Sequence, residues 1–158
     1  IKLKRENLNL ADMTKEIVHA LSPLANKKGV EFEMICEDSL EIEGDKLKLE
    51  QVVSNIVDNA IKYTPEGGRV KVETVKEGSI ALIKVSDTGH GISQEEIPRL
   101  FDRFYRVDKA RSRITGGTGL GLSIANEIIN LHGGKITVTS LENEGSVFSV
   151  ELPFAGSN

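Results

Sequence analysis

Two asparagines and a lysine share one face of a predicted helix. Asn55, Asn59 and Lys62 stand at positions i, i+4 and i+7, a spacing that places them together on a helix surface. A carboxamide oxygen can bind Mg²⁺, which prefers oxygen ligands and keeps several waters. Lys62 can then offset phosphate charge, and Tyr63 can offer its ring to a base. The same spacing also fits an ordinary solvated face of a helix.

An Asp-Thr-Gly-His-Gly-Ile sequence, residues 87–92, directly follows an apolar strand pattern. A carboxylate at a strand end, here Asp87, can accept a charge-assisted hydrogen bond from an exocyclic amine such as that of adenine. Gly89 and Gly91 allow the backbone to approach a flat ligand closely. The alternative is a plain Asp-x-Gly turn, which is common.

A glycine-rich run, Gly116–Leu122, opens a predicted helix. Unpaired N–H groups at a helix N-terminus form a ready phosphate site. The run matches neither the P-loop pattern nor the dinucleotide fingerprint, so neither mechanism applies. A flexible connector is the alternative interpretation.

The segment before the glycine-rich run mixes aromatic and basic side chains. Phe101–Asp108 contains Tyr105 and Arg106, and no clear periodicity runs through 103–117. An arginine can bind a phosphate through two hydrogen bonds. Basic and aromatic residues together can also bind nucleic acid, but the segment is short and flanked by Asp102. These features favour phosphate binding by a long functional loop.

Hydrophobic periodicity predicts three main helices. The first follows the capping signal Asn9–Asp12 and ends at Gly29. The second has Asp45 as its N-cap and stops at Thr64–Gly68. The third covers Leu120–Leu131. A capping-box pattern at Ser93, with Glu96 three residues later, predicts a further short helix.

Adjacent pairs of short apolar segments predict strands. The expected strands are 30–36, 40–43, 69–75, 79–86, 135–140 and 146–152. Paired strands between helices do not suit a doubly wound βαβ fold. They favour the α+β class, as a two-layer α/β sandwich with about three helices on one face of a mixed sheet.

Composition fits one domain with one core. The chain has 158 residues, a net charge of −4 and few aromatic residues, so the core must be mainly aliphatic. The acidic balance disfavours a general nucleic-acid surface. The single cysteine, Cys36, fits a small residue in a strand better than a reactive thiol. No run approaches the length of a membrane helix.

The four motifs, in this order and spacing, resemble the N, G1, F and G2 boxes of bacterial sensor histidine kinases. That family belongs to the ATPase superfamily shared with DNA gyrase B, Hsp90 and MutL. The resemblance covers Asn9–Phe154, and Leu100–Leu122 is especially similar to kinases of the WalK, VicK and PhoR type. It implies a Bergerat-type ATP-binding fold with a mobile ATP lid, and ATP and Mg²⁺ as cofactors.

The resemblance also implies residue roles. Asn59 would bind Mg²⁺, Asn55 would line the same site, and Lys62 would touch phosphate, with Asn55, Lys62 and Arg106 as the catalytic set. The nucleotide-binding residues would be Asn55, Asn59, Lys62, Tyr63, Asp87, Gly89, Gly91, Ile92, Tyr105, Arg106, Gly117, Thr118, Gly119, Leu120, Gly121 and Leu122.

Asn55 stands where the gyrase-like relatives carry a glutamate base. A carboxamide is a poor base, which favours transfer of the phosphoryl group over hydrolysis. The family's acceptor is a histidine on a separate dimerisation domain, in a context that His19, His90 and His132 lack. We therefore expect a protein-histidine kinase domain that does not phosphorylate itself. The alternatives are a cytosolic ATPase or serine kinase of the superfamily, or an inactive nucleotide-sensing module.

The resemblance implies a domain organisation and partners. Residues 1–8 would link an upstream dimerisation domain to the catalytic domain at 9–154, with a tail at 155–158. The partners would be that dimerisation domain and a response regulator, with no nucleic acid. The parent would be a homodimer in the bacterial inner membrane, with this fragment a cytoplasmic monomer.

Overall fold

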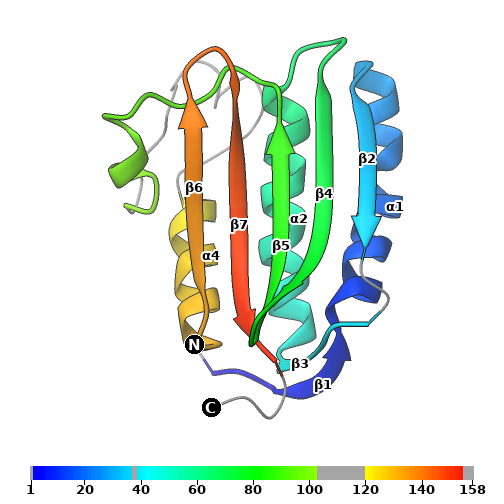
Figure 1. Ribbon diagram of the computed structural model, residues 1–158, viewed down its shortest axis with the longest axis vertical. Coiled ribbons are helices and arrows are strands. Elements are labelled where there is room, and N and C mark those ends of the chain that lie inside the picture. The colour runs from blue at the N-terminus through cyan, green and yellow to red at the C-terminus, as the bar shows by residue number, and fades with distance from the viewer. Residues whose placement is uncertain (1, 37–38, 103–119, 155–158) are drawn as a thin grey trace.

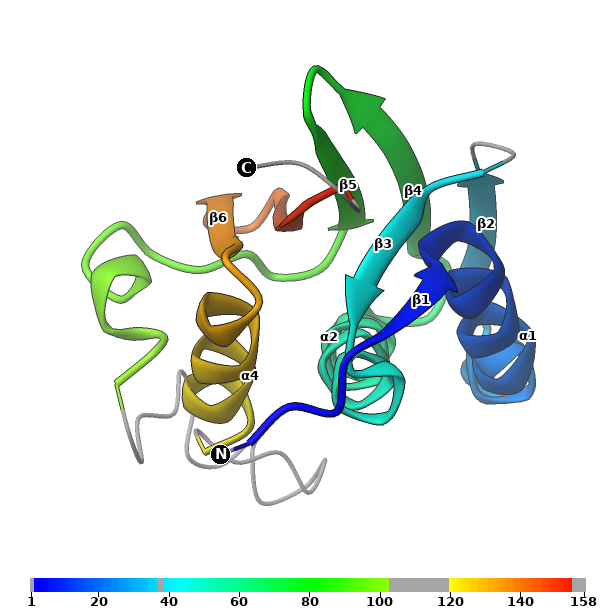
Figure 2. The ribbon, with the colours of Figure 1, turned by 90° about the horizontal axis from the view of Figure 1, so that it is seen from below.

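The computed structural model describes residues 2–36, 39–102 and 120–154. Its helices lie in one layer and its main sheet in another (Figures 1 and 2), which confirms the predicted two-layer sandwich. The helical elements are α1 (Leu10–Lys28), α2 (Lys46–Tyr63), the 3₁₀ helix η1 (Ile97–Arg99) and α4 (Leu120–Leu131). The strands are β1 (Glu6–Asn9), β2 (Glu31–Cys36), β3 (Glu41–Gly44), β4 (Arg69–Glu77), β5 (Ile80–Asp87), β6 (Lys135–Leu141) and β7 (Gly145–Pro153).

The main sheet has five strands in the order β2-β4-β5-β7-β6. β2 and β4 are parallel, whereas β4–β5, β5–β7 and β6–β7 are antiparallel. The sheet is therefore mixed, as predicted, and both expected hairpins form. The central strand β5 ends at Asp87 beside the β6–β7 turn (Figure 1).

The core lies between the sheet and the helices and is almost entirely aliphatic. One face of each strand carries most of the buried residues and the other carries mainly polar and charged ones, as the period of two requires, although Leu82 is buried on the outer face. The buried sheet residues include Val70, Val72, Ile83, Val85, Val150 and Leu152, and α2 contributes Leu49, Val52, Val53, Ile56, Val57 and Ile61. The opposite face holds exposed ion pairs such as Lys135–Glu151 at 3.5 Å.

The helix ends follow the predicted capping signals. Asn9 Oδ1 accepts hydrogen bonds from the N–H groups of Ala11 and Asp12 at the start of α1. Gly29 closes α1 in the left-handed region with φ of 80°. Asp45 caps α2 by accepting from the Lys48 N–H at 3.2 Å. Among the described residues, no helix is long and apolar enough to cross a membrane.

Two local features differ from the predictions. Glu6–Asn9, which overlaps the end of the expected linker, forms β1 and pairs antiparallel with β3 in a separate two-stranded ribbon. The short helix expected from Ser93 is instead a turn, followed by η1 from Ile97. The backbone just before Ser93 is held against β6, because the Ile92 N–H donates to Ser140 Oγ. Pro98 then lies in the first turn of η1, a position where a helix tolerates proline.

A buried histidine joins the two helices at the end of the molecule away from the β6–β7 turn. His132 is 3% exposed; its Nε2 accepts from the Asp45 N–H at 3.0 Å, and its Nδ1 lies 2.8 Å from the Ile128 carbonyl. These partners require a neutral ring protonated on Nδ1. Burial lowers the pKa of His132 below its ordinary value. The ring therefore links α4 to α2 as a neutral group and does not interact with the helix dipole as a cation.

We expect the free energy of unfolding to fall as the pH is lowered from 7 to 5. The unfolded chain protonates His132 near pH 6.5, whereas the folded ring resists protonation, so acid favours unfolding by up to about 1.4 kcal/mol per pH unit. Urea unfolding at successive pH values measures this slope. A His132→Gln variant is expected to reduce the slope, and an unchanged slope would contradict this assignment.

Candidate functional site

Asp87 lies at the end of β5 on the helix-facing side of the sheet. Val85, two residues earlier on the same face, is 1% exposed, whereas Asp87 is half-buried. The Gly89 N–H donates to Asp87 Oδ1 at 2.8 Å. This hydrogen bond occupies one carboxylate oxygen and fixes the side chain's direction, so Asp87 presents an oriented acceptor at the edge of the core.

The loop after Asp87 is packed tightly against the C-terminal end of α2. A Cβ on Gly89 would lie only 2.7 Å from the Tyr63 carbonyl oxygen and 3.4 Å from Thr64 Oγ1. Thr64 itself is buried, and its hydroxyl donates to the Ala60 carbonyl at 2.7 Å. Gly89 is required here because a side chain would push the loop from the helix. Asp87 and Tyr63, predicted from separate motifs, thus belong to one neighbourhood.

The polar stripe of α2 is covered in part by the start of α4. Asn55, Asn59 and Lys62 are all half-buried, so the fully solvated face that the spacing alone allowed is not what forms. A Cβ on Gly121 would lie 2.7 Å from Asn55 Nδ2. The glycine thus lets α4 approach the Asn55 carboxamide, which joins the first predicted motif to the end of the glycine-rich one.

Lys62 forms an ion pair within its own helix. Its Nζ lies 3.1 Å from Asp58 Oδ2, and both side chains are about one-third exposed (32% and 30%). The ammonium must therefore exchange this carboxylate for a phosphate to act as predicted, at a small cost because exposed helix pairs contribute only about 0.5 kcal/mol. Nearby, Lys28 Nζ donates to the Ile61 and Lys62 carbonyls and satisfies the end of α2.

The rest of the 87–92 loop is fastened to the β6–β7 turn. A Cβ on Gly91, whose φ is +70°, would overlap the Leu141 carbonyl oxygen. The Ile92 N–H donates to Ser140 Oγ at 2.7 Å, and the Asn143 N–H donates to the His90 carbonyl. His90 is exposed, as expected for an outward turn residue, while Ile92 is buried.

Four residues in or beside this turn were missed by sequence reasoning: Ser140, Asn143, Gly145 and Ser146. A Cβ on Gly145, whose φ is +127°, would overlap the Asp87 carbonyl oxygen. The local sequence signals a hairpin turn and nothing more. Only the strand order brings it against residues about 50 positions earlier in the chain.

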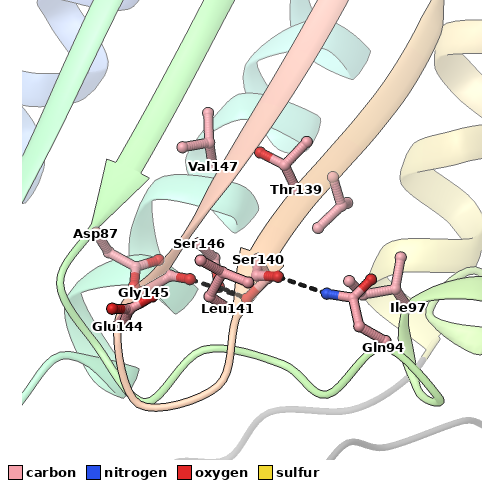
Figure 3. Close-up of a pocket in the computed structure, with 11 residues that line it drawn as sticks. Asp87, Gln94, Ile97, Thr139, Ser140, Leu141, Glu144, Gly145, Ser146 and Val147 are labelled. Carbon is pink, nitrogen blue, oxygen red and sulfur yellow. Dashed lines mark hydrogen bonds between the residues drawn. The ribbon is translucent and has the colours of Figure 1, made fainter.

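A hollow of about 520 Å³ lies at this end of the sheet (Figure 3). It is lined by Asp87, Gln94, Ile97, Val138, Thr139, Ser140, Leu141, Glu144, Gly145, Ser146 and Val147. Of the predicted site residues that the structure describes, Asp87 is the one that lines this hollow. The hollow does not reach the polar stripe of α2, so it covers only the Asp87 end of the predicted site.

Several predicted residues cannot be placed in the site. Tyr105, Arg106, Gly117, Thr118 and Gly119 lie outside the described residues. The backbone of Leu120 begins α4, and Gly121 and Leu122 are half-buried in its first turn.

Comparison with known proteins gives consistent matches. The family described as "Histidine kinase-, DNA gyrase B-, and HSP90-like ATPase" matches residues 44–156. The sensor histidine kinase WalK of Bacillus subtilis (strain 168) is 44% identical over 134 residues, and the match covers 83% of this chain and 22% of WalK. The chain thus spans about a fifth of that relative's length.

Two solved structures extend the match to the fold. The nucleotide-free catalytic domain of histidine kinase ThkA superposes with a TM-score of 0.84 and 31% identity, covering 96% of this chain and 99% of that one. ThkA in complex with the response regulator protein TrrA gives a TM-score of 0.80 and 29% identity, covering 96% of this chain and 42% of that one. The chain belongs to the histidine kinase-, DNA gyrase B- and HSP90-like ATPases and is an ATP-binding catalytic domain of the sensor histidine kinase type.

Proposed function

We propose that this domain binds ATP with Mg²⁺ and donates the γ-phosphoryl group to a histidine on a separate dimerisation domain. One observation carries the proposal: Asp87, at the end of β5, is held against the end of the helix that bears Asn55 and Asn59. A carboxylate suited to an amine thus lies against the end of the helix whose carboxamides would serve the metal. This pairing matches the two ends of a nucleoside triphosphate.

The described residues suit an adenine nucleotide. Asp87 offers an oriented acceptor for an exocyclic amine, and buried Ile92 provides an apolar contact for a ring. Gly89 packs against the C-terminal end of α2, and Gly121 packs against Asn55 in the same helix. Because both are glycines, no side chain separates the packed segments. Lys62 belongs to the same stripe, and its ammonium would neutralise phosphate charge once it leaves Asp58.

The donor set also fits Mg²⁺. Among the described residues, no group of three His, Cys, Asp or Glu side chains could hold a metal ion by itself. A few carboxamide oxygens leave most of the octahedral coordination to phosphates and water, as is usual for this ion. Asn59 would hold the metal and Asn55 would line its site. When bound, the ion would draw charge from the phosphates.

The chain's own residues would act by position and charge. The acceptor histidine nitrogen forms a bond to the γ-phosphorus as the bond from that phosphorus to the bridging oxygen breaks, and ADP leaves. Lys62, and Arg106 from the predicted lid, would stabilise the oxygens of the transferred group. Asn55 cannot take a proton from water at neutral pH, which suppresses hydrolysis in favour of transfer.

We extend the proposal to the parent protein. It would be a homodimer anchored in the bacterial inner membrane, with this domain in the cytoplasm and a response regulator as the next phosphate acceptor. The histidine kinase ThkA, which resembles this chain, has been solved with a response regulator. The identity with WalK supports the same two-component setting.

Transfer is tested by mixing the domain with the separately expressed dimerisation domain of its parent and labelled ATP. We expect acid-labile phosphohistidine on the dimerisation domain and none on this chain. A dimerisation domain lacking its acceptor histidine is the control. Phosphoserine would indicate a serine kinase, and ATP binding without transfer would indicate a nucleotide-sensing module; either would contradict the proposal.

An Asn59→Ala substitution is expected to weaken binding of Mg-ATP about tenfold, the cost of one lost polar interaction. Binding of ATP in the presence of EDTA should change much less, because the carboxamide acts through the metal. Asn130→Ala, at an exposed position of α4, is the matched control. Titration calorimetry measures both affinities, and an equal loss with and without Mg²⁺ would count against a metal-binding role.

A further inference from the structure

Ser140 is a buried hydroxyl with three hydrogen-bonding neighbours. It is 8% exposed in β6. Its Oγ lies 2.7 Å from the Ile92 N, 2.9 Å from the Gly145 carbonyl oxygen and 2.9 Å from Ser146 Oγ. Figure 3 shows Ser140 and Ser146 at the same end of the sheet as Asp87. Ser140 thus connects the loop after Asp87 to the β6–β7 turn.

The three contacts determine where the hydroxyl protons are. A serine hydroxyl has one proton to donate and two lone pairs to accept with. The Ile92 N–H can only donate and the Gly145 carbonyl can only accept, so Ser140 donates to Gly145. All three contacts are satisfied together only if Ser146 donates its proton to Ser140. Ser146 Oγ then has only lone pairs left for any other partner.

Ser146 is the direct cross-strand neighbour of Asp87. The two residues pair in register between β5 and β7, and both lie on the helix-facing side of the sheet. Paired side chains of this kind have Cβ atoms about 5 Å apart. Ser146 is buried, at 6% exposure. An ionised Asp87 can only accept hydrogen bonds, so this end of the sheet presents two neighbouring acceptors.

We infer that Ser140 is a specificity-determining positioning residue, which makes Ser146 an acceptor beside Asp87 so that the pocket selects a purine with an amine at C6 over one with a carbonyl at C6. The inference rests on the proposed function. Adenine carries an amine, with two protons, where guanine carries a carbonyl oxygen. Two acceptors match the amine and repel the carbonyl. If Ser146 could rotate and donate, that discrimination would be lost.

The test compares ATP and GTP analogues, both non-hydrolysable, by titration calorimetry. In Ser140→Ala, the proton of Ser146 is released, and the ratio of ATP affinity to GTP affinity is expected to fall at least tenfold. If Ser140 only stabilised the loop, the substitution would weaken the binding of both nucleotides equally and leave the ratio of their affinities unchanged. Ser140→Thr keeps the hydroxyl and is expected to retain the ratio. Thr137→Ala, on the exposed face of β6, is the control.

Ser146→Ala tests the role of the Ser146 hydroxyl separately from the anchoring of the loop after Asp87, because Ser140 keeps its hydrogen bonds to Ile92 and Gly145. The ratio of ATP affinity to GTP affinity is also expected to fall in this variant. If Ser140→Ala does not fold, the result for Ser146→Ala tests the inference by itself. If both alanine variants keep the wild-type ratio of ATP affinity to GTP affinity, the inference is overturned, whereas the proposed function of the domain is not affected. A wild-type domain that binds neither nucleotide would overturn the proposed function and the inference with it.

Discussion

Asp87→Asn lowers the affinity of the domain for ATP by about 10- to 100-fold, the range expected when a hydrogen bond to a charged group is lost. Asn keeps one oxygen, which still accepts from the Gly89 N–H as Asp87 Oδ1 does. Its NH₂ group then takes the place of the other oxygen. A base amine would meet a donor where it needs an acceptor.

Titration calorimetry with a non-hydrolysable ATP analogue measures this loss. A thermal unfolding scan checks that the variant, which retains the Gly89 contact, is folded. Asp12→Asn, at an exposed position in the first turn of α1, removes a carboxylate elsewhere and should bind as the wild type does. Wild-type affinity in a correctly folded Asp87→Asn variant would show that the base binds elsewhere.

Gly145→Ala has the largest expected effect on stability. A Cβ there would overlap the Asp87 carbonyl oxygen, and the φ of +127° is a conformation that L side chains rarely adopt. Strain and overlap together are expected to cost about 3 kcal/mol of unfolding free energy. Nucleotide binding should also be lost, because any relief of the overlap moves Asp87.

Gly78→Ala is the matched control for backbone strain. Gly78 also has positive φ, at +60°, but nothing lies within 4 Å of a Cβ placed on it. The cost should be about 1 kcal/mol, with normal ATP affinity. Urea unfolding gives both free energies. Equal losses in the two variants would mean that the contact between Gly145 and Asp87 does not contribute to the fold.

The elements that bear the predicted motifs were predictable because each has a strong local signal. The helix with Asn55 and Asn59 has a regular apolar face and a cap at Asp45, and the strand before Asp87 is an apolar run. β1 was missed because its pairing with β3 depends on a segment more than 30 residues later. Four residues give too little alternation to identify a strand.

The site was predicted as separate pieces, and the contacts that join them could not be predicted. The hydrogen bond from Ile92 to Ser140 spans 48 positions, and Gly121 contacts a carboxamide 66 positions earlier in the chain. Such contacts follow from strand order and helix packing, which a single sequence does not encode locally. The ion pair of Lys62 with Asp58 was not predicted either, although its i,i+4 spacing is a local signal that a sequence does carry.

Equilibrium titration of the purified domain with a non-hydrolysable ATP analogue, with Mg²⁺ and with EDTA, tests the central claim most directly. The account predicts one site per chain, tighter binding with Mg²⁺, and competition by ADP but not by GTP at equal concentration. If a folded sample with Mg²⁺ gave no heat of binding with the ATP analogue and no competition by ADP, the account would be contradicted.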